Sequence, residues 1–186
     1  MELVTTRLRL DALRPGDADA LFACRADPAV ARFQGWRPAD LAAMSEFIDA
    51  QAATADLSGG WRQRAIRLRG DGMLIGDLGI HLPERAEDSV EFGISIAPAH
   101  QGRGYASEAV QAVFERVFGQ LGRHRIHASV DPRNLASMAM LRALGMRQEA
   151  HHRESLWLHG EWVDDVIFAM LKHEWQACRA VDGHRG

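Results

Sequence analysis

A glycine-containing segment in the middle of the chain has the residue types and spacing most suited to binding chemistry. Residues 97–106 read Ala-Pro-Ala-His-Gln-Gly-Arg-Gly-Tyr-Ala and join an apolar stretch to a long amphipathic one. The first N–H groups of a helix lack intrahelical partners, and the helix dipole adds positive charge there, so a phosphate can bind. Small residues such as Gly102 and Gly104 allow close approach. We interpret the segment as a candidate anion site; a strand-to-helix turn without a ligand is the alternative.

Two common nucleotide-binding motifs do not match this segment. No Gly-Lys-Ser or Gly-Lys-Thr follows the glycines, which excludes a P-loop. The sequence Gly-Arg-Gly-Tyr-Ala-Ser lacks the third glycine of the dinucleotide fingerprint, and the strands before it do not alternate with helices. The common nucleotide-binding folds are therefore disfavoured.

The elements around the segment follow from hydrophobic periodicity. Alternating apolar residues predict a first strand within residues 5–13 and a fifth at 125–131, while 61–69, 73–82 and 89–97 form an antiparallel meander that follows a Gly59-Gly60 turn. In the last of these, Val90, Phe92, Ile94 and Ile96 share one face. Helices are expected at 18–26, 38–54, 104–121 and 134–144, the last closed by Gly145. A terminal pair of strands, 146–160 and 161–175, turns near His159-Gly160.

The segment also resembles the Q/R-x-x-G-x-G/A pyrophosphate loop of the GNAT N-acetyltransferase superfamily, with Gln101, Gly104 and Ala106 at its defined positions. The stretches TTRLRLDAL, FGISIAPAHQGRGYASEAV and DPRNLASMAMLRALGMRQEA resemble the branch that contains the ribosomal-protein alanine N-acetyltransferases, over approximately residues 3–172. The resemblance implies an α/β (α+β) fold, a mixed and mostly antiparallel seven-stranded sheet flanked by about four helices. Its fourth and fifth strands splay apart.

The resemblance further implies acetyl-CoA as cosubstrate. The pantetheine arm would lie in the gap between the splayed strands, and the backbone N–H groups from Gln101 to Ser107 would bind the pyrophosphate, with a charged contact from Arg103. The expected cofactor-binding residues are Ile94, Ile96, Gln101, Gly102, Arg103, Gly104, Tyr105, Ala106, Ser107 and Asn134.

Three residues are candidates for proton transfer. Many family members place a tyrosine acid on the helix after the fifth strand, but Leu141 stands at that position, so the tyrosine mechanism does not carry over. The ribosomal-protein branch instead places a serine near the thioester sulfur, which Ser137 matches; a helix-start role beside the cap Asn134 is the alternative. For the base, the resemblance implies Glu91, with Glu154 as its rival, and a solvated strand glutamate is the plain alternative.

Composition limits the partners. The net charge is -3 with scattered basic residues, so we expect no nucleic acid partner. Cys24 and Cys178 are far apart, and the nine histidines form no His-x-x-x-His pair, so we expect neither a disulfide nor a metal site. Without a long apolar run or a signal-peptide core, we expect a cytoplasmic protein without a membrane partner. An exposed edge on the terminal strands would allow a homodimer.

The sequence thus predicts one acetyltransferase domain over residues 1–186, with a core at about 3–175 and a disordered tail at 176–186. The predicted function is acetyl-CoA-dependent transfer of an acetyl group to a primary amine, either a protein N-terminus or a small amine. A catalytically silent acyl-CoA-binding module is the first alternative, and an interaction domain without a ligand is the second.

Overall fold

The computed structural model describes residues 2–52, 60–85 and 89–182, and this part of the chain forms one mixed sheet of eight strands. The strand order is β1-β2-β3-β4-β5-β6-β8-β7, and β5 and β6 form the parallel pair among otherwise antiparallel neighbours. The predicted fold class is confirmed. The strands are β1 (Leu3–Val4), β2 (Leu8–Ala12), β3 (Gly60–Leu68), β4 (Leu74–Leu82), β5 (Val90–Ile96), β6 (Arg125–Val130), β7 (Arg147–Leu158) and β8 (Glu161–Leu171).

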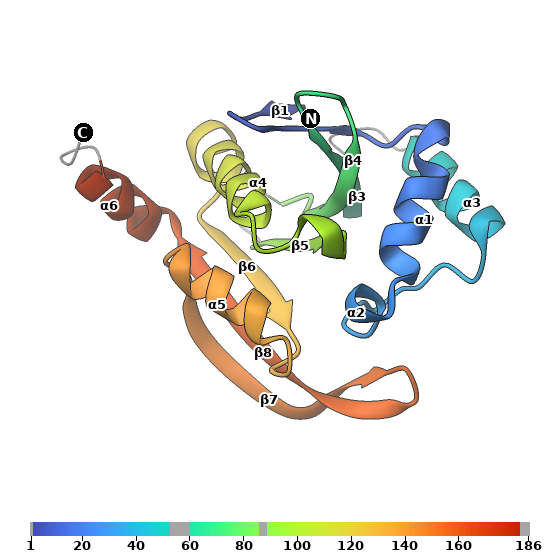
Figure 1. Cartoon of the computed structure of the whole chain (residues 1–186). Coiled ribbons are helices and arrows are strands. Elements are labelled where there is room, and N and C mark those ends of the chain that lie inside the picture. The colour runs from blue at the N-terminus through green and yellow to red at the C-terminus, as the bar shows by residue number, and fades with distance from the viewer. Residues whose placement is uncertain (1, 53–59, 86–88, 183–186) are drawn as a thin grey trace.

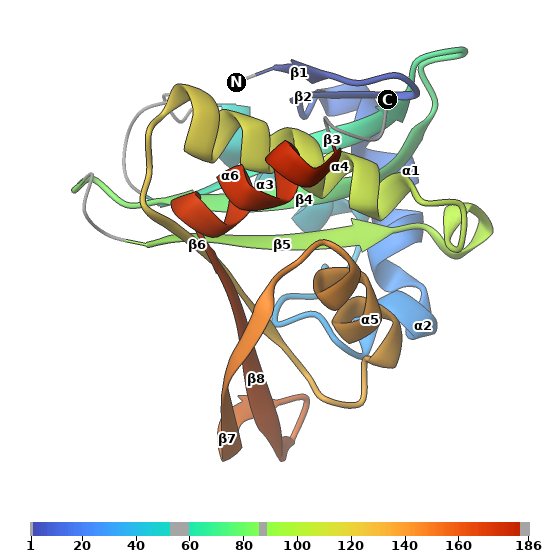
Figure 2. The ribbon, with the colours of Figure 1, turned by 90° about the vertical axis from the view of Figure 1, so that its left-hand side faces the viewer.

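The extra strand relative to the prediction is β1, which is too short to produce an alternating pattern. The helices are α1 (Ala18–Ala26), α2 (Pro28–Ala31), α3 (Leu41–Ala52), α4 (Tyr105–Phe114), α5 (Leu135–Ala143) and α6 (Lys172–Asp182). Figures 1 and 2 show α4 on one face of strands β3 to β5 and α1 and α3 on the other face. None of the described helices is long and apolar enough to cross a bilayer.

Two sequence expectations are corrected by the helices. Helix α2 lies between the helices expected at 18–26 and 38–54, where no element was predicted; Asp27 caps it by accepting a hydrogen bond from the Ala29 N–H at 2.8 Å. The strand expected to extend to residue 175 ends at Leu171. Helix α6 follows it and continues to Asp182, into the tail that we expected to be disordered from residue 176. Glu174 accepts a hydrogen bond from the Leu171 N–H at 2.8 Å, as at other helix starts. The predicted Gly59 turn, the end of the predicted 38–54 helix and residues 183–186 lie wholly or partly outside the described residues.

The apolar face of α4 covers the sheet. Val110, Val113 and Phe114 are buried there, and a π-helical turn (Glu115–Gln120) continues the same face. They pack on the face of β5 that carries Val90 and Phe92, and the rings of Phe92 and Phe114 meet edge to face at 6.1 Å. The helix and the shared strand face are therefore as predicted.

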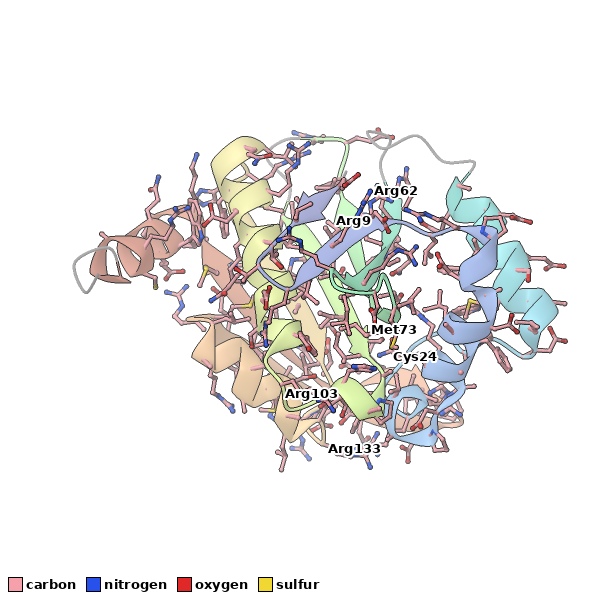
Figure 3. All side chains as sticks on the ribbon, turned by 45° about the horizontal axis from the view of Figure 1, so that its top comes forward. Arg9, Cys24, Arg62, Met73, Arg103 and Arg133 are labelled. Carbon is pink, nitrogen blue, oxygen red and sulfur yellow. The ribbon has the colours of Figure 1, made fainter. Side chains whose placement is uncertain are left out.

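A second buried cluster fills the space between α1, α3 and the sheet. Leu21, Met44 and Ile48 are fully buried in it. Cys24 lies on α1 beside this layer (Figure 3). A buried arginine of α1, Arg25, pairs with Asp77 of β4 across this layer.

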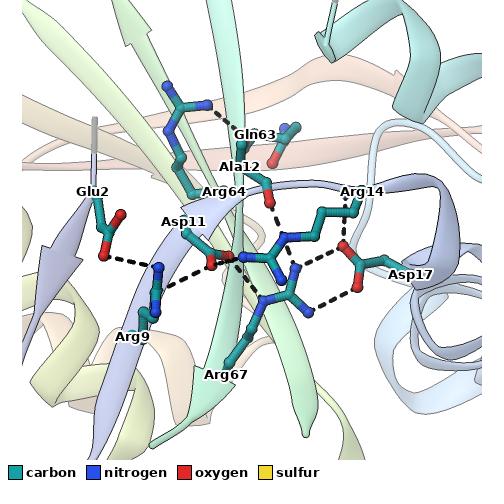
Figure 4. Close-up of polar contacts among 9 residues, drawn as sticks. All are labelled: Glu2, Arg9, Asp11, Ala12, Arg14, Asp17, Gln63, Arg64 and Arg67. Atoms are coloured by element: carbon teal, nitrogen blue, oxygen red, sulfur yellow. Dashed lines mark hydrogen bonds and ion pairs between the residues drawn. The ribbon is translucent and has the colours of Figure 1, made fainter. Parts of the chain in front are cut away.

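A buried ion cluster ties the first helical turn to the sheet (Figure 4). Arg67 of β3 donates to Asp11 at 2.8 Å and to both carboxylate oxygens of Asp17 at 2.7 Å. Asp17 also accepts from the Arg14 N–H at 2.7 Å. Because each buried charge has a partner here, the cluster holds the entry to α1 in place.

The feature that positions the site is the divergence of β5 and β6. They pair only through Val90–Ile126 and Glu91–His127, whereas β5 stays paired with β4 up to Ile96. β6 pairs with β8 over its whole length, and Figure 2 shows β5 and β6 running apart. The predicted splay is confirmed, and it leaves one backbone edge of β5 without a neighbouring strand.

Candidate active site

Two adjoining cavities occupy the splayed region. The larger has a volume of about 490 Å³ and extends from Ile94 to the start of α4. The smaller has a volume of about 140 Å³ and lies between β5, β6 and α5. They share the lining residues Phe33, Gln34, Ile94, Asn134, Ser137 and Met140. A ligand in the larger cavity therefore has one end beside the smaller one.

The loop between β5 and α4 forms one end of the larger cavity. Gly102 and Gly104 have φ angles of 71° and 77°, a left-handed backbone that other residues adopt only with strain. The Gln101 side chain donates to the Ile96 carbonyl at 2.8 Å, which folds the loop back onto the strand. The glycines are needed because the chain must reverse tightly before α4 begins.

The backbone N–H groups of residues 102–107 are available to bind an anion. None of the hydrogen bonds found within the described residues uses one of these donors, whereas the Glu108 N–H already bonds to the Gly104 carbonyl at 3.1 Å. Gly102, Gly104, Tyr105, Ala106 and Ser107 line the larger cavity together with Gln101. Unpaired N–H groups at a helix start provide an anion site.

Arg103 differs from its neighbours in the loop. Its side chain is exposed and does not line either cavity. Its backbone carbonyl accepts a hydrogen bond from Arg7 Nη1 at 2.9 Å. In this structure, Arg103 therefore helps to hold the loop in place through its backbone carbonyl.

The free edge of β5 continues from the loop toward the smaller cavity. Ile94 lines both cavities and Ile96 lines the larger one. Since no strand pairs with this edge beyond Glu91, its N–H and C=O groups can pair with an extended ligand that carries amides.

Helix α5 places Ser137 where the two cavities meet. Asn134 Oδ1 caps the helix by accepting from the Ser137 N–H at 3.1 Å. The cap and the cavity position are compatible, because the cap uses the backbone of Ser137 and leaves its hydroxyl. Leu141, which occupies the position of the tyrosine acid in many family members, is buried and lines the smaller cavity.

The chain's one tyrosine, Tyr105, lies in the loop region instead. Its ring packs under the Arg7 guanidinium, 4.6 Å from the ring centre.

The two candidate bases lie outside the lining of both cavities. Glu91 is at the closed end of the splay, with an oxygen 3.7 Å from His127 Nε2. Glu154 lies on an irregular part of β7 with a φ of 46°, and its side chain is exposed. The structure therefore brings together Ser137, Asn134, Ile94, Ile96 and the loop, but neither glutamate joins them at the cavity wall.

Sequence reasoning missed several residues of the smaller cavity. Phe33 and Gln34 come from the segment after α2, while Ser129 and Asp131 come from the end of β6. Burial raises the pKa of Asp131, but its hydrogen bonds to Arg133 lower it by more, so its pKa lies below the ordinary value. The signal in the sequence was a polar pair at alternate positions next to Asn134, which is too common to interpret alone.

Comparison with known proteins agrees with this geometry. A family model for the acetyltransferase (GNAT) domain matches residues 7–147. The Uncharacterized N-acetyltransferase YoaA of Bacillus subtilis is 31% identical over 91% of this chain and 96% of that protein. Uncharacterized N-acetyltransferase YnaD, also of Bacillus subtilis, is 35% identical over 58% of this chain; the match spans 63% of that relative's length.

Two further similarities bear on the branch and the fold. The [Ribosomal protein uS5]-alanine N-acetyltransferase of Escherichia coli is 32% identical over 45% of this chain and 43% of that protein. The crystal structure of a GNAT-family acetyltransferase from Bacillus anthracis superposes with a TM-score of 0.84 and 24% identity, covering 93% of this chain and 99% of that one. With the family model matching most of the chain, the splayed strands and the loop before α4 have their explanation: the chain belongs to the acetyltransferase (GNAT) family.

Proposed function

We propose that this protein transfers the acetyl group of acetyl-CoA to a primary amine, by direct attack of the amine on the thioester. The observation that carries the proposal is the continuous path from the unpaired N–H groups of residues 102–107, along the free edge of β5, to Ser137. The path has an anion site at one end and a polar cavity at the other.

The path matches the parts of the coenzyme in order. The pyrophosphate takes the N–H groups of residues 102–107, since the Gln101 N–H already bonds to the Pro98 carbonyl at 3.2 Å, and the amides of the pantetheine arm pair with the backbone of β5 beside Ile94 and Ile96. Asn134 supports the thioester end by fixing the start of α5. The thioester then lies where the cavities meet, next to Ser137.

The chemistry needs few groups. The amine nitrogen attacks the thioester carbon, the carbonyl oxygen gains negative charge, and an N–H on the β5 edge near Ile94 stabilises it. When the carbon–sulfur bond breaks, the electron pair goes to sulfur, and the Ser137 hydroxyl donates a proton to it and regains one from solvent. A thiol has an ordinary pKa of about 8.5, so thiolate is a fair leaving group and this donation accelerates the step without being essential.

The acceptor is a protein N-terminus or a small amine. The uS5-alanine relative supports the first class. A cytoplasmic location and a homodimer through the β7 edge of the sheet stay predictions, as does the choice of Glu91 or Glu154 as the base.

Calorimetric titration with acetyl-CoA tests the proposal, with desulfo-CoA and adenosine diphosphate as controls. We expect saturable 1:1 binding of acetyl-CoA and desulfo-CoA and weaker binding of the nucleotide, because the β5 edge contributes to the first two only. Absence of binding would remove the proposal. Binding without thiol release for any amine would favour the silent acyl-CoA-binding module.

A further inference from the structure

Asp165 is a buried carboxylate whose hydrogen-bond partner is a serine hydroxyl, whereas the other buried carboxylates pair with arginines. Counted as whole residues, four carboxylates are buried in the described structure, namely Asp11, Asp17, Asp77 and Asp165. Arginine neutralises the first three: Arg67 pairs with Asp11 and Asp17, and Arg25 pairs with Asp77. Asp165 is 8% exposed, and its partner in the described structure is a neutral hydroxyl, Ser129 Oγ, at 2.6 Å. A buried carboxylate without a cation is costly, so its retention calls for a role.

The sheet places this pair at the smaller cavity. Ser129 pairs with Ile167 in the β6–β8 ladder, so Asp165 is its diagonal neighbour on the same face. Ser129 lines the smaller cavity with Gly93, Ile94 and Ser137. This face of β6 is opposite to the one that Ala128 and Val130 bury in the core. Ser129 is an exposed residue on that face, so an acceptor amine can reach it from solvent on the side away from α5.

We propose that Ser129 and Asp165 form a relay that removes a proton from the acceptor amine; this inference rests on the proposed function. Ser129 contacts the amine nitrogen, and Asp165 is a positioning and proton-accepting residue that acts through it. As the nitrogen–carbon bond forms, the nitrogen becomes positively charged and far more acidic than a free ammonium group. Ser129 Oγ takes its proton and passes its own to Asp165 Oδ1, which releases it to water.

The atoms balance over the whole reaction. One N–H proton leaves through the relay, the carbon–sulfur bond gives its electron pair to sulfur, and the thiolate receives one proton through Ser137. A weak base suffices for the relay because it acts on the charged tetrahedral species and not on the free ammonium ion.

Other charged groups face the pair and must be separated from it in a pH experiment. His152 is opposite Asp165 across the β7–β8 ladder. His127 and Asp131 flank Ser129 on the same face of β6, Arg133 pairs with Asp131, Glu91 lies beside His127, and Arg32 approaches from the segment after α2.

The kinetic test compares Asp165→Asn and Ser129→Ala with Glu91→Gln and Glu154→Gln, and uses Asp19→Asn on the exposed face of α1 as the charge control. The probe is a peptide with an N-terminal alanine, and the readouts are acetyl-CoA affinity by calorimetry and the pH profile of kcat. We expect acetyl-CoA affinity within about twofold of wild type in both relay variants. We also expect kcat to fall about 100-fold, with loss of the acidic limb of the profile. Retention of that limb in Asp165→Asn, or its loss in a glutamate variant alone, would overturn the relay.

A second measurement needs no acceptor. Removing a charge that is buried for function leaves stability unchanged or raised, whereas removing one of a buried ion pair lowers it. We expect Asp165→Asn to unfold at or above the wild-type temperature, and the matched Asp77→Asn to unfold roughly 10 °C lower. An equally large decrease for Asp165→Asn would show that the carboxylate is structural and would sink the relay. Failure of wild type to bind acetyl-CoA would instead remove the proposed function.

Discussion

Arg7 holds Glu108 with both its backbone and its side chain. The Arg7 N–H donates to Glu108 Oε1 at 2.8 Å, and Arg7 Nε donates to Glu108 Oε2 at 2.6 Å. Burial raises the pKa of Glu108, but hydrogen bonds from Thr5 and Arg7 lower it by more, so its pKa lies below the ordinary value. The same guanidinium bonds to the Arg103 carbonyl and covers the Tyr105 ring. The turn between β1 and β2 thus supports the loop proposed to bind pyrophosphate, and its positive charge offsets a carboxylate close to that loop.

Arg7→Gln should weaken acetyl-CoA binding about tenfold, equivalent to about 1.4 kcal/mol. The loop loses its clamp, and Glu108 loses the cation that offsets its charge near the phosphates. Arg9→Gln is the matched control, because Arg9 lies two residues after Arg7, in β2, and pairs with Glu2 and Asp11 instead of Glu108. Calorimetry on both variants checks this, and equal affinities would show that Arg7 does not support the site.

Ser107→Glu should abolish measurable acetyl-CoA binding while keeping the fold. A glutamate in the first turn of α4 stabilises the helix by about 0.3–1 kcal/mol through the helix dipole, yet it places negative charge where the phosphate is proposed to bind. Gly104→Glu should have the same effect on binding, but its φ of 77° adds backbone strain. Ser107→Ala is the control and should bind normally. Circular dichroism and calorimetry separate folding from binding; wild-type affinity in Ser107→Glu would refute the loop assignment.

Ser137→Ala should lower kcat about tenfold and leave acetyl-CoA affinity unchanged, because it removes a proton donor and keeps the backbone N–H that bonds to Asn134. Asn134→Ala should instead lower the free energy of unfolding by about 1 kcal/mol, since it removes the cap of α5. Steady-state kinetics and thermal denaturation of both variants distinguish catalysis from capping. A normal kcat in Ser137→Ala would leave this serine as a helix-start residue only.

Acid should destabilise the protein partly through Asp17. Burial raises the pKa of Asp17, but the bonds from Arg67 and the Arg14 N–H lower it by more, to below its ordinary 3.8. A lowered folded-state pKa contributes stability above the unfolded-state value, and this is lost as the pH falls through the folded value.

The matching variant is Asp17→Asn. It should cost about 2 kcal/mol at pH 7, because Arg67 keeps only Asp11, and should lose less further stability than wild type below about pH 4. Unfolding temperatures at pH 7, 5, 4 and 3 check this; parallel curves for the two proteins would contradict it.

The two cysteines should differ sharply in reactivity. Burial, with the nearby charge of Asp77, raises the pKa of the Cys24 thiol to about 12, while Cys178 is exposed. We expect a thiol reagent to modify one cysteine in the native protein and both after denaturation. Cys178→Ser should remove the native reaction, and rapid modification of that variant would show that α1 opens readily. The variant also suits assays that detect released coenzyme A thiol.

The local parts of the site could be predicted from the sequence because they depend on neighbouring residues. The positive φ angles of Gly102 and Gly104, the start of α4 and the Asn134 cap each arise within a few residues, where turn chemistry and helix periodicity act directly. The positions of most strands along the chain followed from alternation, and the splay followed from the family resemblance. The start of α6 was missed because its few apolar residues continue the pattern of β8.

The tertiary structure alone decided which distant polar groups meet. Ser129 bonds to Asp165 because β6 pairs with β8 in one register after it leaves β5, and a shift of one residue would put the two side chains on opposite faces of the sheet. Arg7 reaches Glu108, 101 positions away, because α4 packs across the first strands. Likewise, only the fold shows that three buried aspartates have arginine partners and that Asp165 has a serine. Charge pairing depends on distances in space, and periodicity along the chain carries no record of them.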